Sequence, residues 1–207
     1  MKGLFITFEG MDGAGKSTHV SFLAESLRAL GYAVVVTREP GGCPLAEKIR
    51  EVLLDNQNVN MSARAEALLY AAARAEHVEK VIIPAIASGA VVICDRFVDS
   101  SLAYQGGARG LGMEAITQLN NWAMQDLWPD ITFFMRVTAD SAADRRSDRE
   151  PDRLEQEPQT FHAAVAEGFG RVLAQHADRI QIIDATPPKP EVAADILTRC
   201  LAAMDNG

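Results

Sequence analysis

The chain has 207 residues, of which 48% are hydrophobic and 23% are charged, and its formal net charge is −8. This composition fits one folded domain with its own core and excludes an intrinsically disordered chain. The negative charge also excludes a general nucleic-acid binder, because such proteins present an excess of Lys and Arg to phosphates.

The predicted elements alternate between strands and helices. Five short apolar, β-branched runs predict buried strands, in chain order Leu4 to Phe8, Ala33 to Thr37, Val91 to Cys94, Ile131 to Val137 and Ile180 to Ile183. Helical spacing predicts helices at Thr18 to Leu30, Leu45 to Leu54, Ala63 to Ala87, Glu114 to Leu127, Thr160 to Ala177 and Glu191 to Met204. We expect a kink or break near Pro84, late in the third helix. The alternation predicts a single α/β domain over residues 1–207, with a five-stranded parallel sheet flanked by helices.

The strongest motif follows the first strand. Residues 10–17 read GMDGAGKS, a full match to the phosphate-binding pattern G-x-x-x-x-G-K-[ST] between a strand and a helix. Glycines permit the curvature that turns amide N–H groups toward phosphates, and the helix adds its positive end. We expect Lys16 to contact the β- and γ-phosphates of ATP and Ser17 to ligate Mg²⁺. The predicted ATP-binding residues are Gly10, Met11, Asp12, Gly13, Ala14, Gly15, Lys16, Ser17 and Thr18.

Two further predicted strands end in charged residues. Asp95 and Arg96 follow the third strand, at the edge where open parallel sheets bind ligands. Asp95 can hold Mg²⁺, and Arg96 can bridge the donor and acceptor phosphates. Arg38 follows the second strand, and we interpret it as a ligand of the acceptor phosphate. Spacing alone leaves simpler alternatives open: a surface ion pair for Asp95 and Arg96, and a loop-opening charge for Arg38.

The most polar stretch, at about residues 140–157, is a candidate mobile lid. It carries Arg145, Arg146, Arg149 and Arg153. The phosphate loop has no cation between its first glycine and Lys16, so the charge of the transferring phosphoryl group must be neutralised by another segment. We expect Arg149 or Arg153 to close over the γ-phosphate as a catalytic arginine finger. The alternative is a solvated helix whose arginines pair with neighbouring Asp and Glu.

Five segments taken together resemble the thymidylate kinase family. They are FEGMDGAGKST, TREPGG, AEALLYAAAR, DRFVDSSLAYQGGARG and DRLEQE, in this order from near residue 3 to residue 186. The resemblance implies a three-layer P-loop kinase fold with the basic lid of bacterial-type members. It also implies ATP-dependent, Mg²⁺-assisted phosphorylation of dTMP to dTDP for dTTP synthesis, and a homodimer.

The resemblance further implies an acceptor site for dTMP. Glu9 matches a position near the acceptor sugar, and Arg38 matches the ligand of the dTMP phosphate. Tyr70 falls on the aromatic residue that stacks on thymine, and Arg74, four residues later on one helix face, on the residue that reads the base. Tyr104 matches the residue beneath the sugar that disfavours a 2′-hydroxyl. Plain core packing is the alternative for both tyrosines.

Two other matched positions, Ser101 and Gln105, are base-contacting in the family. Phe97, Tyr70 and Ser101 depart from the residues that are common in the family at these places, and the last two leave the strength of the thymine contacts open. A kinase for another acceptor, such as dUMP, dGMP or a deoxynucleoside, is one alternative function. A P-loop switch ATPase is another, although it leaves Arg74 without a task.

The remaining reactive residues indicate no further chemistry. A phosphate acceptor is mostly a dianion at neutral pH and needs no general base, so we interpret the histidines as surface or helix-packing residues: His19, His77, His162 and His176. The three cysteines are few and widely spaced, which predicts free thiols. With no signal-like or membrane-spanning apolar run, we expect a cytoplasmic protein without a membrane partner.

Overall fold

The computed structural model describes residues 3–137 and 151–205 of the chain. At its centre, five strands form a parallel sheet in the order β2-β3-β1-β4-β5. The strands are β1 (Leu4–Glu9), β2 (Val34–Arg38), β3 (Val91–Asp95), β4 (Ile131–Arg136) and β5 (Ile180–Asp184). Each agrees with its predicted range to within one residue at either end, so the predicted fold class is confirmed.

Each strand contributes side chains to two cores, because successive residues of a strand point to opposite faces of the sheet. In β1, Phe5 packs into the core on one face, whereas Ile6 and Phe8 pack into the core on the other. All three side chains are completely buried. Burial on both faces explains why the strands appear in the sequence as continuous apolar runs.

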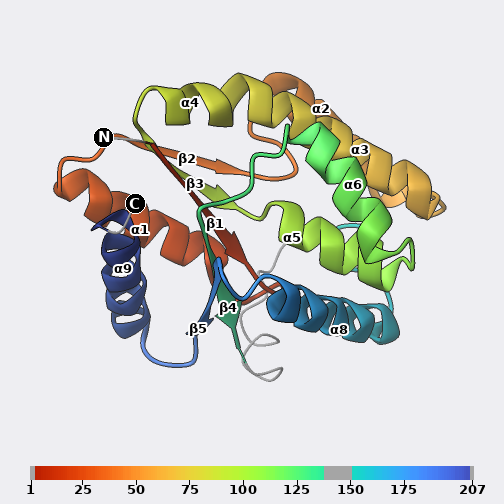
Figure 1. Cartoon of the computed structure of the whole chain (residues 1–207). Helices are drawn as coiled ribbons and strands as arrows, with labels where there is room; N and C mark the ends of the chain where they lie inside the picture. Colours follow the sequence, from red (N-terminus) through yellow and green to blue (C-terminus); the bar gives the residue numbers. More distant parts are fainter. Residues whose placement is uncertain (1–2, 138–150, 206–207) are drawn as a thin grey trace.

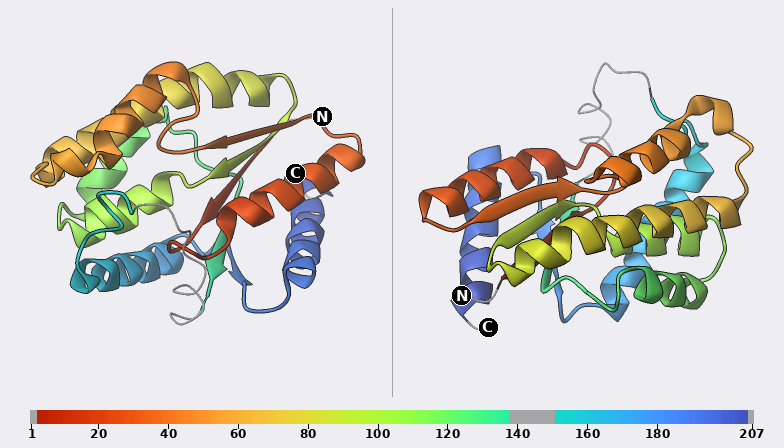
Figure 2. Two further views of the ribbon diagram at one scale, coloured as in Figure 1. Left: turned by 180° about the vertical axis from the view of Figure 1, so that it is seen from behind. Right: turned by 90° about the horizontal axis from the view of Figure 1, so that it is seen from above.

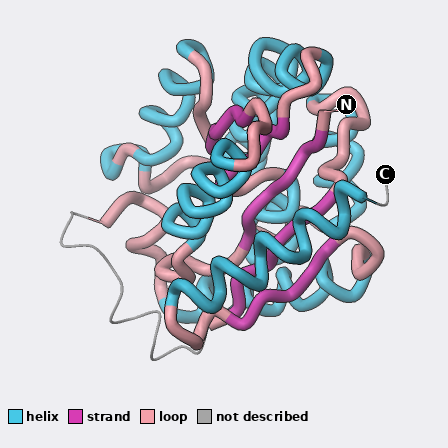
Figure 3. The backbone as a smooth tube through the Cα atoms, turned by 90° about the vertical axis from the view of Figure 1, so that its left-hand side faces the viewer, coloured by secondary structure: helices cyan, strands magenta, loops and turns pink. Residues whose placement is uncertain are grey.

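Helices cover both faces of the sheet (Figures 1 and 2). One face is covered by α1 (Lys16–Ala29) and α9 (Lys189–Asp205), which pack on each other and lie in front of the strands in Figure 3. The other face is covered by α3 (Ala63–His77), α4 (Ile83–Ala87), α5 (Val98–Ser101), α6 (Met113–Ala123) and α8 (Gln159–Gln175). Outside this layer, α2 (Pro44–Leu54) packs on α3.

The helical regions differ from the sequence prediction at two places. The predicted third helix is interrupted: α3 ends at His77, a π-helical turn, η2 (Val78–Ile82), follows, and α4 begins just before Pro84. The expected break is thereby confirmed, since proline cannot donate the next helical hydrogen bond. The second difference is α5 and the π-helix η3 (Leu102–Ala108), which were not predicted. Their serines and glycines weaken the helical signal in the sequence.

The packing of α8 on η3 requires a glycine at one position. A Cβ at Gly168 would lie 2.7 Å from the carbonyl oxygen of Ala103 and 2.9 Å from its Cα. Because both atoms belong to the backbone, Gly168→Ala should lower the free energy of unfolding by about 1–3 kcal/mol. Gly170 is a matched control, since a Cβ there meets nothing within 4 Å; Gly170→Ala should raise that free energy by about 0.5–1 kcal/mol. Urea unfolding of both variants measures the difference, and equal stabilities would contradict this account.

Candidate active site

The carboxyl ends of β1, β2 and β3 form one edge of the sheet. Asp95, the last residue of β3, is level with Phe8 of β1 and with Arg38 of β2. Glu9, Arg38, Asp95 and Arg96 therefore lie along this edge, as predicted. In open parallel sheets this is the edge where ligands bind.

The phosphate loop follows β1 and leads directly into α1. Gly10 has φ 136°, and a Cβ there would lie 2.6 Å from the carbonyl oxygen of Met135, so the loop passes too close to β4 for another residue. Gly15, also left-handed at φ 85°, is the N-cap of α1. The buried Lys16 ammonium donates to the carbonyl oxygens of Gly10 at 3.1 Å and Met11 at 2.9 Å. The lysine is thus held over the loop.

Ser17 and Asp95 meet beside the loop. The Ser17 hydroxyl donates to Oδ2 of Asp95 at 2.6 Å, so the two predicted metal ligands are brought together. Both offer oxygen, the ligand type that Mg²⁺ prefers, and Mg²⁺ in such sites takes one or two protein oxygens plus phosphates and waters. Within residues 3–137 and 151–205 no group of three or more His, Cys, Asp or Glu could hold a metal. The donor set therefore fits Mg²⁺ bound with a nucleotide.

Arg96 and Asp12 form an ion pair next to the loop. Nη2 of Arg96 lies 2.6 Å from Oδ1 of Asp12, and Nη1 donates to Ser100 Oγ at 3.0 Å. Burial alone would raise the pKa of Asp12, but Arg96 and Lys16 outweigh it and lower the pKa to about 2. The Tyr104 hydroxyl donates to the other carboxylate oxygen of Asp12 at 3.4 Å. Asp12, predicted only as an ATP-binding residue, therefore faces the predicted sugar-contacting tyrosine.

The backbone of Arg96 is left-handed, with φ 69°. This conformation is uncommon for a residue other than glycine and is typical of functional sites. Here the Arg96 N–H donates to the carbonyl oxygen of Phe8 at 2.9 Å. Burial would lower the pKa of Arg96, but the Asp12 carboxylate raises it above its usual value, so the guanidinium stays charged.

Glu9 is completely buried beneath the start of α5. One carboxylate oxygen accepts from the backbone N–H of Phe97 at 2.8 Å and of Ser100 at 3.2 Å, and the other accepts from the Ser100 hydroxyl at 2.6 Å. Burial and the nearby Asp99 carboxylate raise the pKa of Glu9. Glu9 thus fixes α5, and through Ser100 it contacts the same segment as Arg96.

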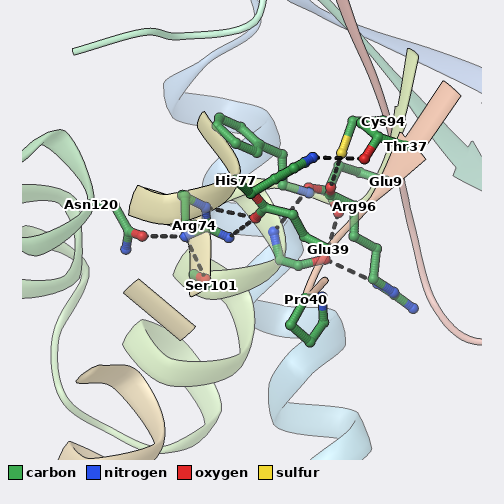
Figure 4. Close-up of polar contacts among 12 residues, drawn as sticks. Glu9, Thr37, Glu39, Pro40, Arg74, His77, Cys94, Arg96, Ser101 and Asn120 are labelled. Carbon is green, nitrogen blue, oxygen red and sulfur yellow. Dashed lines mark hydrogen bonds and ion pairs between the residues drawn. The ribbon is translucent and has the colours of Figure 1, made fainter. Parts of the chain in front are cut away.

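Arg74 lies at the centre of a buried polar network (Figure 4). Its Nε donates to Glu39 at 2.8 Å, and its Nη1 donates to Ser101 at 3.0 Å and to Asn120. The guanidinium carbon also lies 5.0 Å from the centre of the Phe97 ring. Two predicted base-contacting residues, Arg74 and Ser101, are thereby in direct contact.

The other predicted base and sugar residues surround this network. Gln105 donates to Glu66 at 2.9 Å. Tyr70 is half-buried on α3, one turn after Glu66 and one turn before Arg74. The Tyr104 ring is buried, with its centre 6.1 and 6.2 Å from the ring centres of Phe161 and Phe169.

Arg38 and the candidate fingers are placed differently. The Arg38 side chain is 47% exposed and pairs with Glu47 of α2 at 3.0 Å. Arg153 is buried, with Nη2 2.8 Å from Glu66 and Nε donating to the Leu53 carbonyl at 2.8 Å. Among the described residues, Arg153 has no hydrogen bond to the phosphate loop. Arg145, Arg146 and Arg149 lie outside the described residues, as does the predicted lid up to residue 150.

Several residues of these networks were not predicted as site residues, among them Glu39, Glu66, His77 and Asn120. Of the two interpretations of His77, surface or helix-packing residue, the structure agrees with the second: its side chain is completely buried, with Nδ1 2.9 Å from Glu39 and Nε2 2.6 Å from the Thr37 hydroxyl. One signal for it was available, because His77 follows Arg74 by three residues and so shares its helix face. Glu39 lies within the TREPGG segment.

Comparisons with known proteins agree with this geometry. The sequence model of the family described as thymidylate kinase matches residues 8–196. A thymidylate kinase from Lactobacillus acidophilus is 50% identical over 202 residues, which cover 96% of this chain and 94% of the relative. One from Shouchella clausii is 49% identical over 199 residues, covering 95% and 93%. The crystal structure of thymidylate kinase from Ehrlichia chaffeensis superposes with a TM-score of 0.80 at 33% identity, covering 97% of this chain and 100% of that one.

The chain belongs to the thymidylate kinase family. The resemblance carried by the five sequence segments is therefore confirmed, together with the P-loop kinase fold and the classification as a phosphotransferase enzyme. The family match extends over the phosphate loop from Phe8 onward, β2, β3 and the network around Arg74. The geometry of the site can accordingly be interpreted as a site for two nucleotides.

The state of Lys16 predicts how ATP use depends on pH. Burial and the nearby Arg96 guanidinium lower the pKa of Lys16 to about 8. Phosphates bind the protonated ammonium, so kcat/KM for ATP should fall as pH rises through about 8, approaching tenfold per pH unit. Initial rates at saturating dTMP between about pH 6.5 and 9.5 measure this. The matched variant is Lys16→Arg, whose guanidinium stays protonated. Its reaction should be slower, and its kcat/KM for ATP should not fall as pH rises through about 8. A wild-type kcat/KM that does not change with pH would contradict the assignment of Lys16 as the phosphate ligand that titrates.

Proposed function

We propose that this member of the family phosphorylates dTMP at the edge formed by β1, β2 and β3, with the phosphate loop holding ATP on one side and Arg74 holding the thymine base on the other. Family membership makes the reaction the ATP-dependent phosphorylation of dTMP to dTDP. The observation that carries the assignment of residues is the contact of Arg96 with Asp12 of the phosphate loop at 2.6 Å. This contact places a permanently charged guanidinium at the boundary between the two proposed nucleotide sites.

The donor side consists of Gly10 to Thr18. Backbone N–H groups of the loop and the ammonium of Lys16 bind the phosphates of ATP, and the contact of Ser17 with Asp95 supports these two residues as the holders of Mg²⁺. When bound, Mg²⁺ neutralises charge on the β- and γ-phosphate oxygens. Lys16 and Arg96 then hold the two anionic nucleotides in line and compensate their mutual repulsion.

The acceptor side consists of residues on α3, α5 and η3. Arg74 and Ser101 contact the base directly, Tyr70 stacks on it, and Tyr104 lies beneath the sugar. The full set of proposed acceptor residues is Glu9, Arg38, Tyr70, Arg74, Arg96, Ser101, Tyr104 and Gln105. Because the phosphate of dTMP is mostly a dianion at neutral pH, it attacks without a general base.

The arginine finger is the catalytic residue left to assign. Arg153 is buried and its guanidinium is engaged by Glu66 and the Leu53 carbonyl. Moving it to a phosphate would leave the buried Glu66 carboxylate with one cation fewer, which is costly. We therefore propose Arg149 as the finger and Arg153 as the residue that holds the segment after it against α2 and α3.

We also propose a single-domain homodimer in the cytoplasm, with the predicted lid at about residues 140–157. Support for a dimer comes from two large apolar side chains on the adjacent helices α3 and α6, Leu68 at 58% and Trp122 at 84% exposed. None of the described helices is long and apolar enough to cross a membrane.

The activity is tested by measuring ADP release from Mg-ATP with dTMP, dUMP, ribosyl TMP and dGMP offered separately. We expect dTMP to be the preferred acceptor and the 2′-hydroxyl of ribosyl TMP to be disfavoured by Tyr104. Lys16→Ala should abolish transfer while leaving the fold intact. Equal ADP release with and without any acceptor would indicate a simple ATPase and refute the proposal.

The assignment of the finger predicts different effects for two arginines. Arg149→Met should lower kcat by about 10³-fold with little change in thermal stability. Arg153→Met should lower the melting temperature, because it leaves Glu66 with fewer partners, and should lower kcat by less than about tenfold. The double variant Arg153→Met/Glu66→Gln should lose less stability than the sum of the losses in the two single variants. A 10³-fold loss of kcat in Arg153→Met alone would instead make Arg153 the finger.

A further inference from the structure

The donor groups of Arg74 are almost fully engaged by protein. A guanidinium has five N–H donors. The Nε donor is used by Glu39 at 2.8 Å, and both Nη1 donors are used by Ser101 and Asn120. Nη2 lies 2.7 Å from the same Glu39 oxygen. Within the described part of the chain, this leaves one Nη2 donor for an outside acceptor.

Glu39 fixes the direction of that remaining donor. Its Oε2 faces Arg74, whereas its Oε1 lies 2.9 Å from Nδ1 of His77. Its backbone N–H donates to the carbonyl oxygen of Asp95 at 3.0 Å. The carboxylate is thus held on one oxygen by Arg74 and on the other by His77, and it is almost completely buried. Neither Arg74 nor Glu39 can rotate without breaking charge-assisted hydrogen bonds.

His77 is in turn fixed from its other side. Nε2 of the ring lies 2.6 Å from the hydroxyl of Thr37 on β2. A Cβ at Gly42 would lie 2.5 Å from the His77 ring and 2.6 Å from the Thr37 hydroxyl, so the loop after β2 packs directly on this pair. The chain of contacts runs from Thr37 through His77 and Glu39 to Arg74 (Figure 4).

We infer that His77 is a positioning residue for recognition of the acceptor base: through Glu39 it holds the Arg74 guanidinium so that the remaining Nη2 donor points at a carbonyl oxygen of the base. The inference rests on the proposed function, because it takes Arg74 as the base-reading residue. A single fixed donor accepts a base with a carbonyl oxygen at that point and disfavours one with an amino group there. His77 thereby contributes to the preference for thymine over cytosine without touching the nucleotide.

The geometry also separates this role from general packing. His77 has no hydrogen bond to the phosphate loop, to Ser17 or to Asp95 in the described residues, so loosening it should leave the donor side unchanged. It acts on Arg74 through two charge-assisted hydrogen bonds in series. A change at His77 should therefore alter the KM for the acceptor and the preference among acceptors, and should leave kcat and the KM for ATP unchanged.

The test is a graded series measured with dTMP, dCMP and ATP on the full chain. His77→Leu removes both ring contacts, and we expect KM for dTMP to rise about tenfold, with kcat and KM for ATP within about twofold of wild type. The ratio of kcat/KM for dTMP to that for dCMP should fall by a similar factor. His77→Asn can keep an N–H donor near the Nδ1 position and should raise KM for dTMP by only about twofold to threefold.

A second variant tests the positioning of His77 through its hydrogen bond with Thr37, without altering the histidine itself. Thr37→Val removes the hydroxyl that holds Nε2, and KM for dTMP should rise about threefold. The matched control is Thr7→Val, because Thr7 is a buried threonine of β1, in the same sheet, whose hydroxyl pairs with that of Thr132 at 2.7 Å, outside the Arg74 network. Thr7→Val should cost comparable stability and leave KM for dTMP and the ratio of dTMP to dCMP unchanged.

The outcomes distinguish this inference from the function on which it rests. A wild-type enzyme that does not phosphorylate dTMP contradicts both. An active wild-type enzyme whose His77→Leu and Thr37→Val variants lose only thermal stability, with dTMP binding and the preference over dCMP intact, overturns the role of His77 alone. Equal effects of Thr37→Val and Thr7→Val on KM for dTMP would overturn it as well.

Discussion

The parallel pairing of β3 with both β1 and β2 is the constraint on which the site depends. It sets Asp95 level with Phe8 and Arg38, so that the chain leaves three neighbouring strands at one edge. A slip of one residue in either pairing would turn every side chain of the slipped strand to the opposite face. The contact of Ser17 with Asp95 and that of Arg96 with Asp12 both require this register, since each joins the loop after β1 to the end of β3.

The arginines of the site are oriented by carboxylates of the chain itself. Arg74 is paired with Glu39, Arg96 with Asp12, and Arg153 with Glu66, so each guanidinium already has a fixed carboxylate partner. Two of these pairs, Arg74 with Glu39 and Arg153 with Glu66, are buried. Removing either partner of a buried pair leaves an uncompensated charge, which makes these two arrangements rigid even where they add little net stability. Rigid, charged donors suit a reaction whose catalysis consists of positioning and electrostatic stabilisation.

Sequence reasoning succeeded where the physical cause is local. Apolar runs determine the strands, and the phosphate loop follows from residues 10–17 alone. It failed where partners are distant: Arg74 contacts residues 35, 27 and 46 positions away, so no spacing could select Glu39, Ser101 and Asn120 as its partners. Arg153 illustrates the same limit, because the local sequence gives no sign of its contact with a buried carboxylate 87 residues earlier. Helix-face spacing was the one local signal left unused, and it connects His77 to Arg74.

The proposed acceptor side also depends on the π-helix η3, whose backbone packs closely against α8. Gly168 allows α8 to approach the backbone of η3, which is π-helical at the residues that carry Tyr104 and Gln105. Such wide turns are frequent at functional sites, because they redirect side chains that a regular helix would space evenly. Here the Tyr104 ring packs against Phe161 and Phe169 of α8, while its hydroxyl donates to Asp12 of the phosphate loop. The close packing of α8 therefore positions the Tyr104 ring, and the deoxyribose site proposed above depends on Gly168 as well as on Tyr104.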